Sequence, residues 1–317
     1  MQNLLILTQV VLLAVGFFML VKGADWFVEG AAGIADRFGI PQIVIGLTIC
    51  AFGTSAPEAA ISISAALRGN AALTIGNVVG SNILNILLIL GITALITPLA
   101  IKKNTFRYEI PFVAVVTLLL LGLGVAGGTV SRMDGGILWL FMILFLVYLF
   151  RMAKTGEADM VEEIPEDAKQ DPLWKLLVCT IGGMVLIVWG SDITVDSATE
   201  IAHFFHMSER LIGLTIVAFG TSLPELITSV TAGIKGKADI AIGNIVGSNI
   251  FNILFVVGTA ALITPVAFAS NFIIDSIIAT LAAVMLFVCV AKHMQLRKMS
   301  GIVMLVSYAA YFVYLLQ

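Results

Sequence analysis

The chain has 317 residues, of which 60% are hydrophobic and only 12% are charged. Soluble domains are about 45–50% apolar and about 25% charged, so this composition excludes a soluble globular protein. The net charge of −3 leaves no basic surplus for nucleic acid, and the three cysteines, all inside apolar stretches, form no metal-binding pattern.

Apolar stretches long enough to cross a bilayer follow one another along the chain. A spanning helix needs about 20 residues, and ten stretches qualify. They are continuous runs without the alternation of a membrane β-barrel. The sequence therefore predicts an all-α membrane protein with ten transmembrane helices. We expect these helices at residues 4–33, 40–68, 72–98, 109–126, 135–152, 173–203, 210–234, 239–265, 271–291 and 299–316.

The basic residues predict an orientation for these ten helices. Thirteen of the 17 lysines and arginines fall on the side opposite the N-terminus, and three fall on the N-terminal side. Cytoplasmic loops are enriched in Lys and Arg, so the richer side is expected to be cytoplasmic. We therefore expect an integral protein of the plasma (inner) membrane with both termini outside. Residues 153–172 are interpreted as an acidic, solvated cytoplasmic loop.

An internal repeat covers the most informative part of the chain. Residues 43–91 align with residues 210–258 at a shift of 167 positions, and 28 of the 49 pairs are identical. Five predicted helices separate equivalent positions, and five is an odd number. The second copy must therefore enter the membrane from the opposite face, which is typical of secondary transporters. We expect two inverted five-helix repeats, residues 1–152 and 173–317, joined by residues 153–172.

Each copy of the repeat contains a helix-breaking motif. The motif reads GTSAPE at residues 53–58 and GTSLPE at residues 220–225. Pro57 and Pro224 lack an N–H group, so each frees the carbonyl four residues before it. Freed carbonyls, hydroxyls and a carboxylate within six residues form a cluster of hard oxygen ligands, which suits Na⁺ or Ca²⁺.

The acidic residue of each motif predicts a function. A carboxylate in the middle of a membrane helix costs at least about 2.5–3.5 kcal/mol, so Glu58 and Glu225 are expected to be functional. Their equivalent positions in the two copies allow them to meet near the midplane. By contrast, we interpret Asp25 and Asp192, near the ends of the first and sixth helices, as structural partners.

A row of amides and hydroxyls follows in the third and eighth helices. Asn77, Ser81 and Asn85 are spaced four apart and share one helical face. Their counterparts are Asn244, Ser248 and Asn252. Asn82 and Asn249 lie about 100° away around the helix. We favour helix packing for Asn77, Asn82 and their counterparts. We favour cation binding for Ser81, Asn85, Ser248 and Asn252.

The doubled pattern GTSxPE followed by GNxxGSN resembles the alpha repeats of the cation/calcium antiporter superfamily. More narrowly, it is similar to the Na⁺/Ca²⁺ exchangers, including the K⁺-dependent branch and its prokaryotic relatives. The resemblance implies a ten-helix fold with four neighbouring sites between two kinked helix pairs. One of these sites takes Ca²⁺, and the others take Na⁺, a proton or water.

The resemblance also assigns roles by position. For Ca²⁺ it implies the side chains of Glu58 and Glu225 and the backbone carbonyls of Thr54 and Thr221. For Na⁺ it implies Ser55, Ser222, Ser81, Ser248 and the carbonyls of Ala51 and Ala218. Asn85 and Asn252 would border the central site.

One departure from the family pattern affects the charge of the site. Many members have aspartate at one of the last two positions, whereas both Asn85 and Asn252 are neutral here. Two acidic groups then face the site, and two charges balance one Ca²⁺ or two Na⁺. The number of Na⁺ ions exchanged, K⁺ dependence and proton coupling stay open.

We predict a secondary active transporter that exchanges Na⁺ for Ca²⁺ by alternating access, with the long first and sixth helices sliding as gates. An H⁺/Ca²⁺ or other divalent-cation antiporter is the alternative. A channel would need a continuous pore, and an intramembrane enzyme would need a base near Ser55 or Ser222. We expect no enzymatic activity and no cofactor. The expected partners are the lipid bilayer and small cations, namely Ca²⁺ and Na⁺ with K⁺ or H⁺ as further candidates, and neither nucleic acid nor protein.

Overall fold

The computed structural model describes residues 2–69, 71–155, 171–205 and 218–315. This part of the chain is helical, apart from turns and four two-residue strands. The elements of the first half are α1 (Gln2–Phe38), α2 (Gln42–Ile45), η1 (Gly46–Cys50), α3 (Ala51–Thr54), α4 (Ala56–Leu67), α5 (Ala72–Leu84), η2 (Asn85–Ile89), α6 (Leu90–Ile96), β1 (Leu99–Ala100), η3 (Thr105–Glu109), α7 (Ile110–Gly127), β2 (Thr129–Val130) and α8 (Arg132–Thr155).

The second half repeats this order. Its elements are α9 (Leu173–Phe204), α11 (Ala218–Gly220), α12 (Leu223–Ile234), α13 (Ala238–Phe251), η5 (Asn252–Val257), α14 (Gly258–Ile263), β3 (Val266–Ala267), α15 (Asn271–Ala291), β4 (Gln295–Leu296) and α16 (Lys298–Leu315). The η elements are π-helical turns, which occur frequently at functional sites.

The helices confirm an integral membrane protein. Eight described helices are long and apolar enough to cross a bilayer, and the pair Gln42–Thr54 and Ala56–Leu67, bent by 52°, makes nine. The tenth predicted helix, residues 210–234, lies partly outside the described residues. Only α11 and the 12-residue α12 of it are described, and α12 alone is too short to span. Most of the predicted loop 153–172 also lies outside the described residues.

The 167-residue shift also relates the secondary structure of the two halves. Helices α4 and α12 have equal lengths at equivalent positions, and η2 and η5 begin at the equivalent Asn85 and Asn252. The turns after α4 and α12 each use a glycine with positive φ, 77° at Gly69 and 72° at Gly236. Equivalent sequences therefore adopt equivalent local structures.

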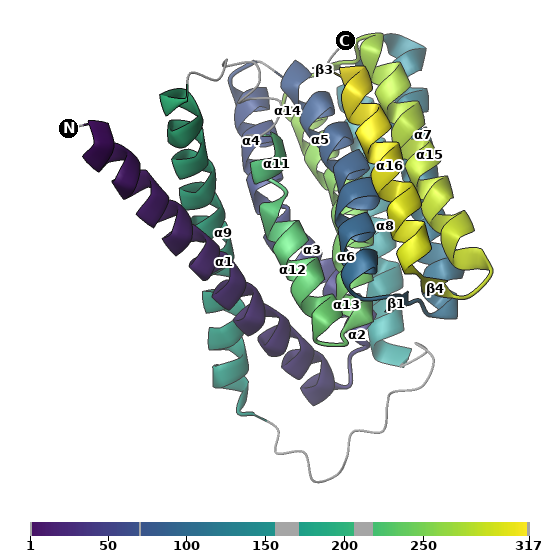
Figure 1. Ribbon diagram of the computed structural model, residues 1–317. Helices are drawn as coiled ribbons and strands as arrows, with labels where there is room; N and C mark the ends of the chain where they lie inside the picture. The colour runs from purple at the N-terminus through teal and green to yellow at the C-terminus, as the bar shows by residue number, and fades with distance from the viewer. Residues whose placement is uncertain (1, 70, 156–170, 206–217, 316–317) are drawn as a thin grey trace.

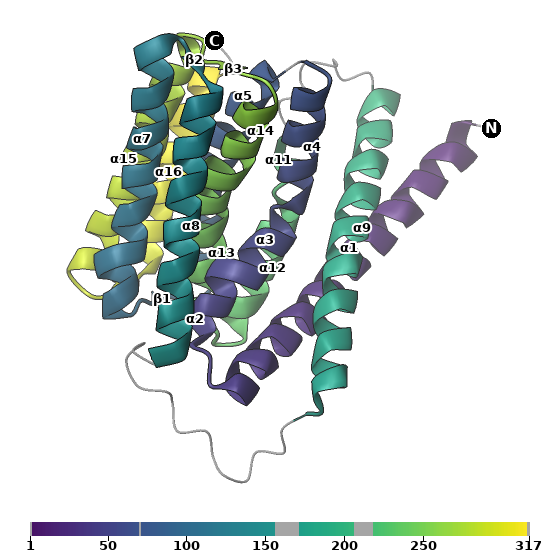
Figure 2. The same ribbon diagram turned by 180° about the vertical axis from the view of Figure 1, so that it is seen from behind.

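Short strands join the two halves at both ends of the helical bundle. Strand β1 pairs antiparallel with β4, and β2 pairs antiparallel with β3. The β1–β4 pair lies at the lower end of the molecule in Figure 1, and β2 and β3 lie at the upper end in Figure 2. Helix α4 ascends while its counterpart α12 descends (Figure 1). The two halves thus run in opposite directions.

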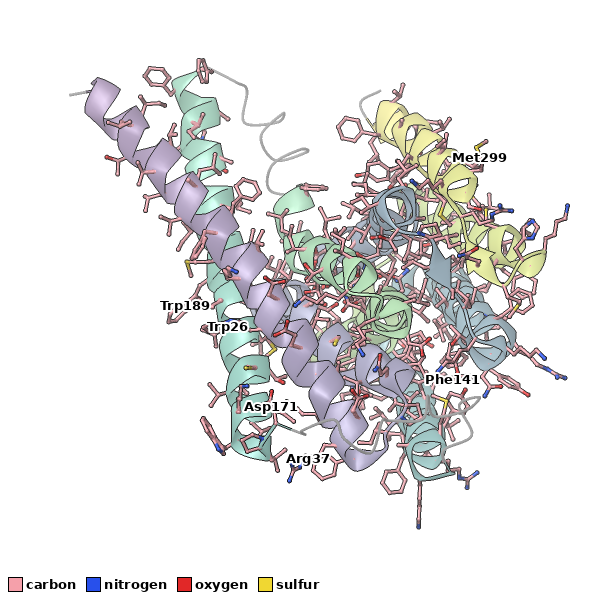
Figure 3. All side chains as sticks on the ribbon, turned by 60° about the horizontal axis from the view of Figure 1, so that its bottom comes forward. Trp26, Arg37, Phe141, Asp171, Trp189 and Met299 are labelled. Atoms are coloured by element: carbon pink, nitrogen blue, oxygen red, sulfur yellow. The ribbon has the colours of Figure 1, made fainter. Side chains whose placement is uncertain are left out.

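Helices α1 and α9 form a crossed pair at the side of the bundle (Figure 1). Glycines allow their backbones to touch, since a Cβ atom on Gly23 would lie 2.8 Å from the carbonyl oxygen of Gly183. At the lower end, Nη1 of Arg37 donates to the carbonyl of Asp171, 3.2 Å away (Figure 3). Helix α1 approaches the other helices mainly toward its C-terminal end (Figures 1 and 2). The pair is therefore more extensively packed against itself than against the bundle.

Helix α13 lies at the centre of the bundle, and almost all of its residues are buried. It packs against η1 and α3 from the other half. Gly46 and Gly243 meet at this contact, and a Cβ on Gly243 would lie 2.9 Å from the Cα of Gly46. Such close backbone approach between membrane helices depends on small residues. This contact brings the first broken helix against the polar row of the second half.

Candidate cation-binding site

The predicted helix breaks are present in both halves. Helix α3 ends at Thr54, Ser55 leaves helical geometry with ψ at 9°, and Pro57 lies in the first turn of α4. In the second copy, Ser222 has ψ at 6° before α12 begins. Each motif therefore produces a broken helix with a new N-terminus inside the bundle.

The second break exposes a carbonyl that its own helix cannot use. Pro224 has no N–H to donate to Gly220, and the Gly220 carbonyl accepts a bond from Oγ of Ser191 at 2.9 Å. Ser191 belongs to α9, so the crossed pair contacts the break directly.

The two glutamates lie in the first turns of the new helices. Glu58 in α4 and Glu225 in α12 are 0% and 1% exposed. The positive end of each helix dipole favours a carboxylate at this position. No described lysine or arginine forms an ion pair with either glutamate. Two buried acids thus lie without a counter-charge from the described residues.

Hydroxyl groups of the opposite half hold each carboxyl. Ser55 Oγ donates to Glu225 Oε1 at 2.8 Å, and Ser222 Oγ donates to Glu58 Oε1 at 3.4 Å. Thr54 also lies beside Glu225, as Thr221 lies beside Glu58. The carboxyl groups are near enough for their negative charges to repel one another. The contacts between the halves therefore bring the two glutamates close together.

Four asparagines, from α5, η2, α13 and η5, form hydrogen bonds between the two halves. Asn82 Nδ2 donates to the carbonyl of Asn249 at 3.0 Å, and Asn249 Nδ2 donates to that of Asn82 at 3.1 Å. Asn85 Nδ2 then donates to Asn249 Oδ1, and Asn252 Nδ2 to Asn82 Oδ1. This arrangement uses the amide nitrogens of Asn85 and Asn252 and leaves their oxygens free as acceptors.

A second pair of asparagines supports the broken helices. Asn77 Nδ2 donates to the Glu58 carbonyl at 3.2 Å and to Ser62 Oγ at 2.9 Å. Asn244 Nδ2 makes the equivalent bonds to the Glu225 carbonyl and to Ser229 Oγ. These contacts confirm that Asn77 and Asn244 have a packing role, and the reciprocal bonds above confirm it for Asn82 and Asn249.

Four of the buried oxygens that have no hydrogen-bond partner among the described residues belong to the glutamates and to Asn85 and Asn252. Buried polar atoms normally have a partner, so each such atom calls for an explanation. They form two repeat-related pairs from four different elements: Oε2 of Glu58 and Glu225, and Oδ1 of Asn85 and Asn252. The elements that carry them are in contact across the halves, because η5 packs against α4 and η2 packs against α12.

The other predicted ligands have less informative surroundings. Ser248 Oγ contacts the Ala51 carbonyl at 3.4 Å, which joins two proposed Na⁺ ligands from opposite halves. Ser81 is buried, with 7% exposed. Ala218 is helical and lies in α11.

Three supporting groups were not predicted from the sequence. Ser62 and Ser229 hold Asn77 and Asn244, and Ser191 caps the second break. Ser62 and Ser229 follow the glutamates by four residues in both copies, so the repeat contained a signal for them. Ser191 has Ala24 as its counterpart, so the repeat contained none for it.

The chemistry of the site favours hard cations. Its free atoms are carboxyl and amide oxygens, which Na⁺ and Ca²⁺ prefer. No described group of three or more His, Cys, Asp or Glu residues could hold a metal. The site is thus built from two acids supplemented by neutral oxygens.

Comparison with known proteins also points to Na⁺ and Ca²⁺. A family model described as sodium/calcium exchanger protein matches residues 8–151 and 175–317. The inner membrane protein YrbG of Escherichia coli (strain K12) is 39% identical over 264 residues, covering 80% of this chain and 79% of YrbG. Sodium/calcium exchanger MaX1 of Methanosarcina acetivorans is 29% identical over 356 residues, covering 98% of this chain and 99% of MaX1.

Solved structures agree with this relationship. The sodium-calcium exchanger NCX_Mj, soaked with zero Na⁺ and Ca²⁺, has a TM-score of 0.84 at 31% sequence identity, covering 98% of this chain and 99% of NCX_Mj. The match extends over the crossed pair, the broken helices and the polar rows. The chain therefore belongs to the sodium/calcium exchanger family.

Proposed function

We propose that the protein exchanges Na⁺ for Ca²⁺ across the membrane by alternating access at one shared site. The observation that carries this proposal is the pairing of two buried glutamates, from oppositely directed halves, whose Oε2 atoms have no described partner. A cation would supply the missing counter-charge. The ions are the transported substrates rather than resident cofactors.

The proposed architecture comprises ten transmembrane helices in two inverted repeats, residues 1–152 and 173–317. Thirteen basic residues of the sequence lie on one side of these helices. We assign that side to the cytoplasmic face of the plasma membrane. In Figure 1 this is the lower end, where α1 ends and α9 begins. Both termini are then outside.

The proposed Ca²⁺ ligands are the carboxyl groups of Glu58 and Glu225 with the carbonyls of Thr54 and Thr221. Asn85 and Asn252 border this central position with their free amide oxygens. The proposed Na⁺ ligands flank it on both sides: Ser55, Ser222, Ser81, Ser248 and the carbonyls of Ala51 and Ala218. The flanking serines Ser55 and Ser222 contact the carboxyl groups of Glu225 and Glu58, so a Na⁺ ion beside either serine would also draw on a glutamate that binds Ca²⁺. The two kinds of ion therefore compete.

This competition couples the two fluxes. An empty site would expose two unpaired buried carboxylates to each other, which is electrostatically unfavourable. Bound cations relieve that repulsion and permit the change of access. The crossed pair α1–α9 is the proposed moving part, because it packs extensively within itself and touches the broken helices.

The transport reaction can be tested in proteoliposomes containing the purified protein. An outward Na⁺ gradient should drive Ca²⁺ uptake, and dissipating this gradient should stop it. Uptake driven by a pH gradient without Na⁺ would indicate H⁺/Ca²⁺ exchange instead. Ca²⁺ flux without any counter-ion would indicate a channel.

Removing the serine hydroxyls is expected to weaken Na⁺ binding. In Ser55→Ala and Ser222→Ala we expect the Na⁺ concentration for half-maximal exchange to rise about 3- to 10-fold, since each loses one charge-assisted contact. Ser64→Ala, on α4 but outside the site, is the matched control. Unchanged Na⁺ dependence in both site variants would contradict the assignment.

A further inference from the structure

A cluster of charged residues ties the crossed pair to the second broken helix. Lys235, just after α12, lies 3.2 Å from Oδ1 of Asp25 and 2.7 Å from Oε1 of Glu29, both on α1. Its ammonium group also donates to the Asp25 carbonyl at 3.2 Å. We call these three residues the Lys235 cluster. Helix α12 ends at Ile234, at its lower end in Figure 1, and Lys235 is the next residue.

The repeat contains the same charges at the opposite end of the molecule. A shift of 167 positions relates Lys235 to Arg68, Asp25 to Asp192 and Glu29 to Asp196. We call Arg68, Asp192 and Asp196 the Arg68 set. All three of these residues are exposed, and no ion pair joins Arg68 to either aspartate in the described structure. The two aspartates are near enough to repel one another.

Helix packing shows the same asymmetry as the ion pairs. Helix α1 packs along α12, whereas the equivalent contact of α9 with α4 is nearly lacking among the described residues. Among the described residues, the lower end of the crossed pair is thus engaged with the bundle, whereas the upper end has few such contacts. In an inverted repeat, exchanging the conformations of the two halves converts a state open to one side of the membrane into a state open to the other side.

We propose that the Lys235 cluster and the Arg68 set are alternating gate contacts, each formed only in the state in which the other is broken. This inference rests on the alternating-access function proposed above. The present structure corresponds to the state with the Lys235 cluster formed. When α9 closes on α4, Arg68 binds Asp192 and Asp196, and Lys235 separates from Asp25 and Glu29.

The physical argument is a balance of two similar interactions. Ion pairs at partly exposed positions contribute little individually, so neither contact fixes one state permanently. Lys235 has 24% of its side chain exposed and contacts three oxygen atoms. Its interaction should therefore contribute more to stability than a single exposed ion pair does. Loss of the Lys235 contacts should shift the ratio of the two states about two- to fivefold toward the state in which the Arg68 set is formed.

Spin-label distances at the upper end can measure this ratio. The labels replace exposed Leu73 at the start of α5 and Phe205 after α9, with the native cysteines changed to alanine. Lys235→Gln should increase the short-distance population about two- to fivefold. Arg68→Gln should decrease the same population. Lys237→Gln is the matched control and should leave it unchanged.

The opposite signs distinguish a gate contact from a merely structural one. If Lys235→Gln and Arg68→Gln shift the populations in the same direction, or if neither shifts them, the proposal is overturned. Should Lys235→Gln fail to fold, Asp25→Asn breaks the same contact from α1 and carries the same prediction. The distances are measured at a fixed Na⁺ concentration and without any ion flux. A failed Ca²⁺ uptake assay would therefore count against the proposed function but would not change what the distances show about the two contacts.

Discussion

Glutamine in place of Glu58 or Glu225 is expected to lower Na⁺-driven Ca²⁺ uptake at least about 100-fold, since losing one partner of a buried charge interaction costs about 3–5 kcal/mol. Each glutamate is fully buried and has an oxygen without a partner. Glutamine keeps the size and the bond from the opposite serine but removes the charge. The measurement is the initial rate of Ca²⁺ uptake into proteoliposomes with an outward Na⁺ gradient.

A matched control separates this effect from a general loss of acidic charge. Glu200→Gln changes an exposed glutamate on α9 and should retain the wild-type rate. Thermal stability of the two site variants should be equal to or higher than that of the wild type, because the repulsion between the acids is removed. Full exchange by either site variant would refute the assignment of these residues.

The second large effect concerns stability rather than transport. Gly243→Ala is expected to lower the melting temperature by about 5–10 °C, because an added methyl group must fit into a closely packed backbone contact. A Cβ at this position would lie 2.9 Å from the Gly46 Cα and 3.0 Å from the Leu47 nitrogen. Neither atom belongs to a flexible side chain that could move away. The measurement is thermal unfolding of the purified protein in detergent.

Gly80→Ala provides the same chemical change at a position with open space. No heavy atom lies within 4 Å of a Cβ built on Gly80. This variant should melt within about 2 °C of the wild type, since alanine is also the better helix former. Equal melting temperatures for the two variants would contradict the role of the contact between Gly46 and Gly243.

Much of the site could be predicted because the same sequence occurs twice. Proline chemistry predicts where the helices break, and the breaks occur at Ser55 and Ser222. The cost of a buried acid predicts that Glu58 and Glu225 are functional. The inversion predicts that they can meet. All three arguments need only local sequence and the parity of the helix count.

Contacts between the halves could not be predicted in the same way. Ser55 could have bonded Glu58 of its own motif, but helix packing places it against Glu225, 170 positions away. The reciprocal bonds of Asn82 and Asn249 likewise depend on how α5 crosses α13. Lys235 counted in the sequence only as a basic residue for orientation, because nothing local indicates its distant partners on α1.

The helix count shows a different limit. Hydropathy predicts ten apolar stretches, whereas the described residues contain eight continuous candidate spans and one bent pair. At the first break one apolar stretch becomes two helices bent by 52°, and the stretch at residues 210–234, which contains the second break, lies partly outside the described residues. Hydropathy shows how long an apolar stretch is, but it does not show whether the helix bends within that stretch. The structural elements that build the site are therefore those that a hydropathy count represents least well.

The most direct test of the account is the position of a bound divalent cation. Crystals of the protein soaked with Sr²⁺, a heavier analogue of Ca²⁺, should give an anomalous difference peak between the carboxyl groups of Glu58 and Glu225, and Na⁺ should displace it. An anomalous peak elsewhere in the bundle, with none between these two glutamates, would contradict the account.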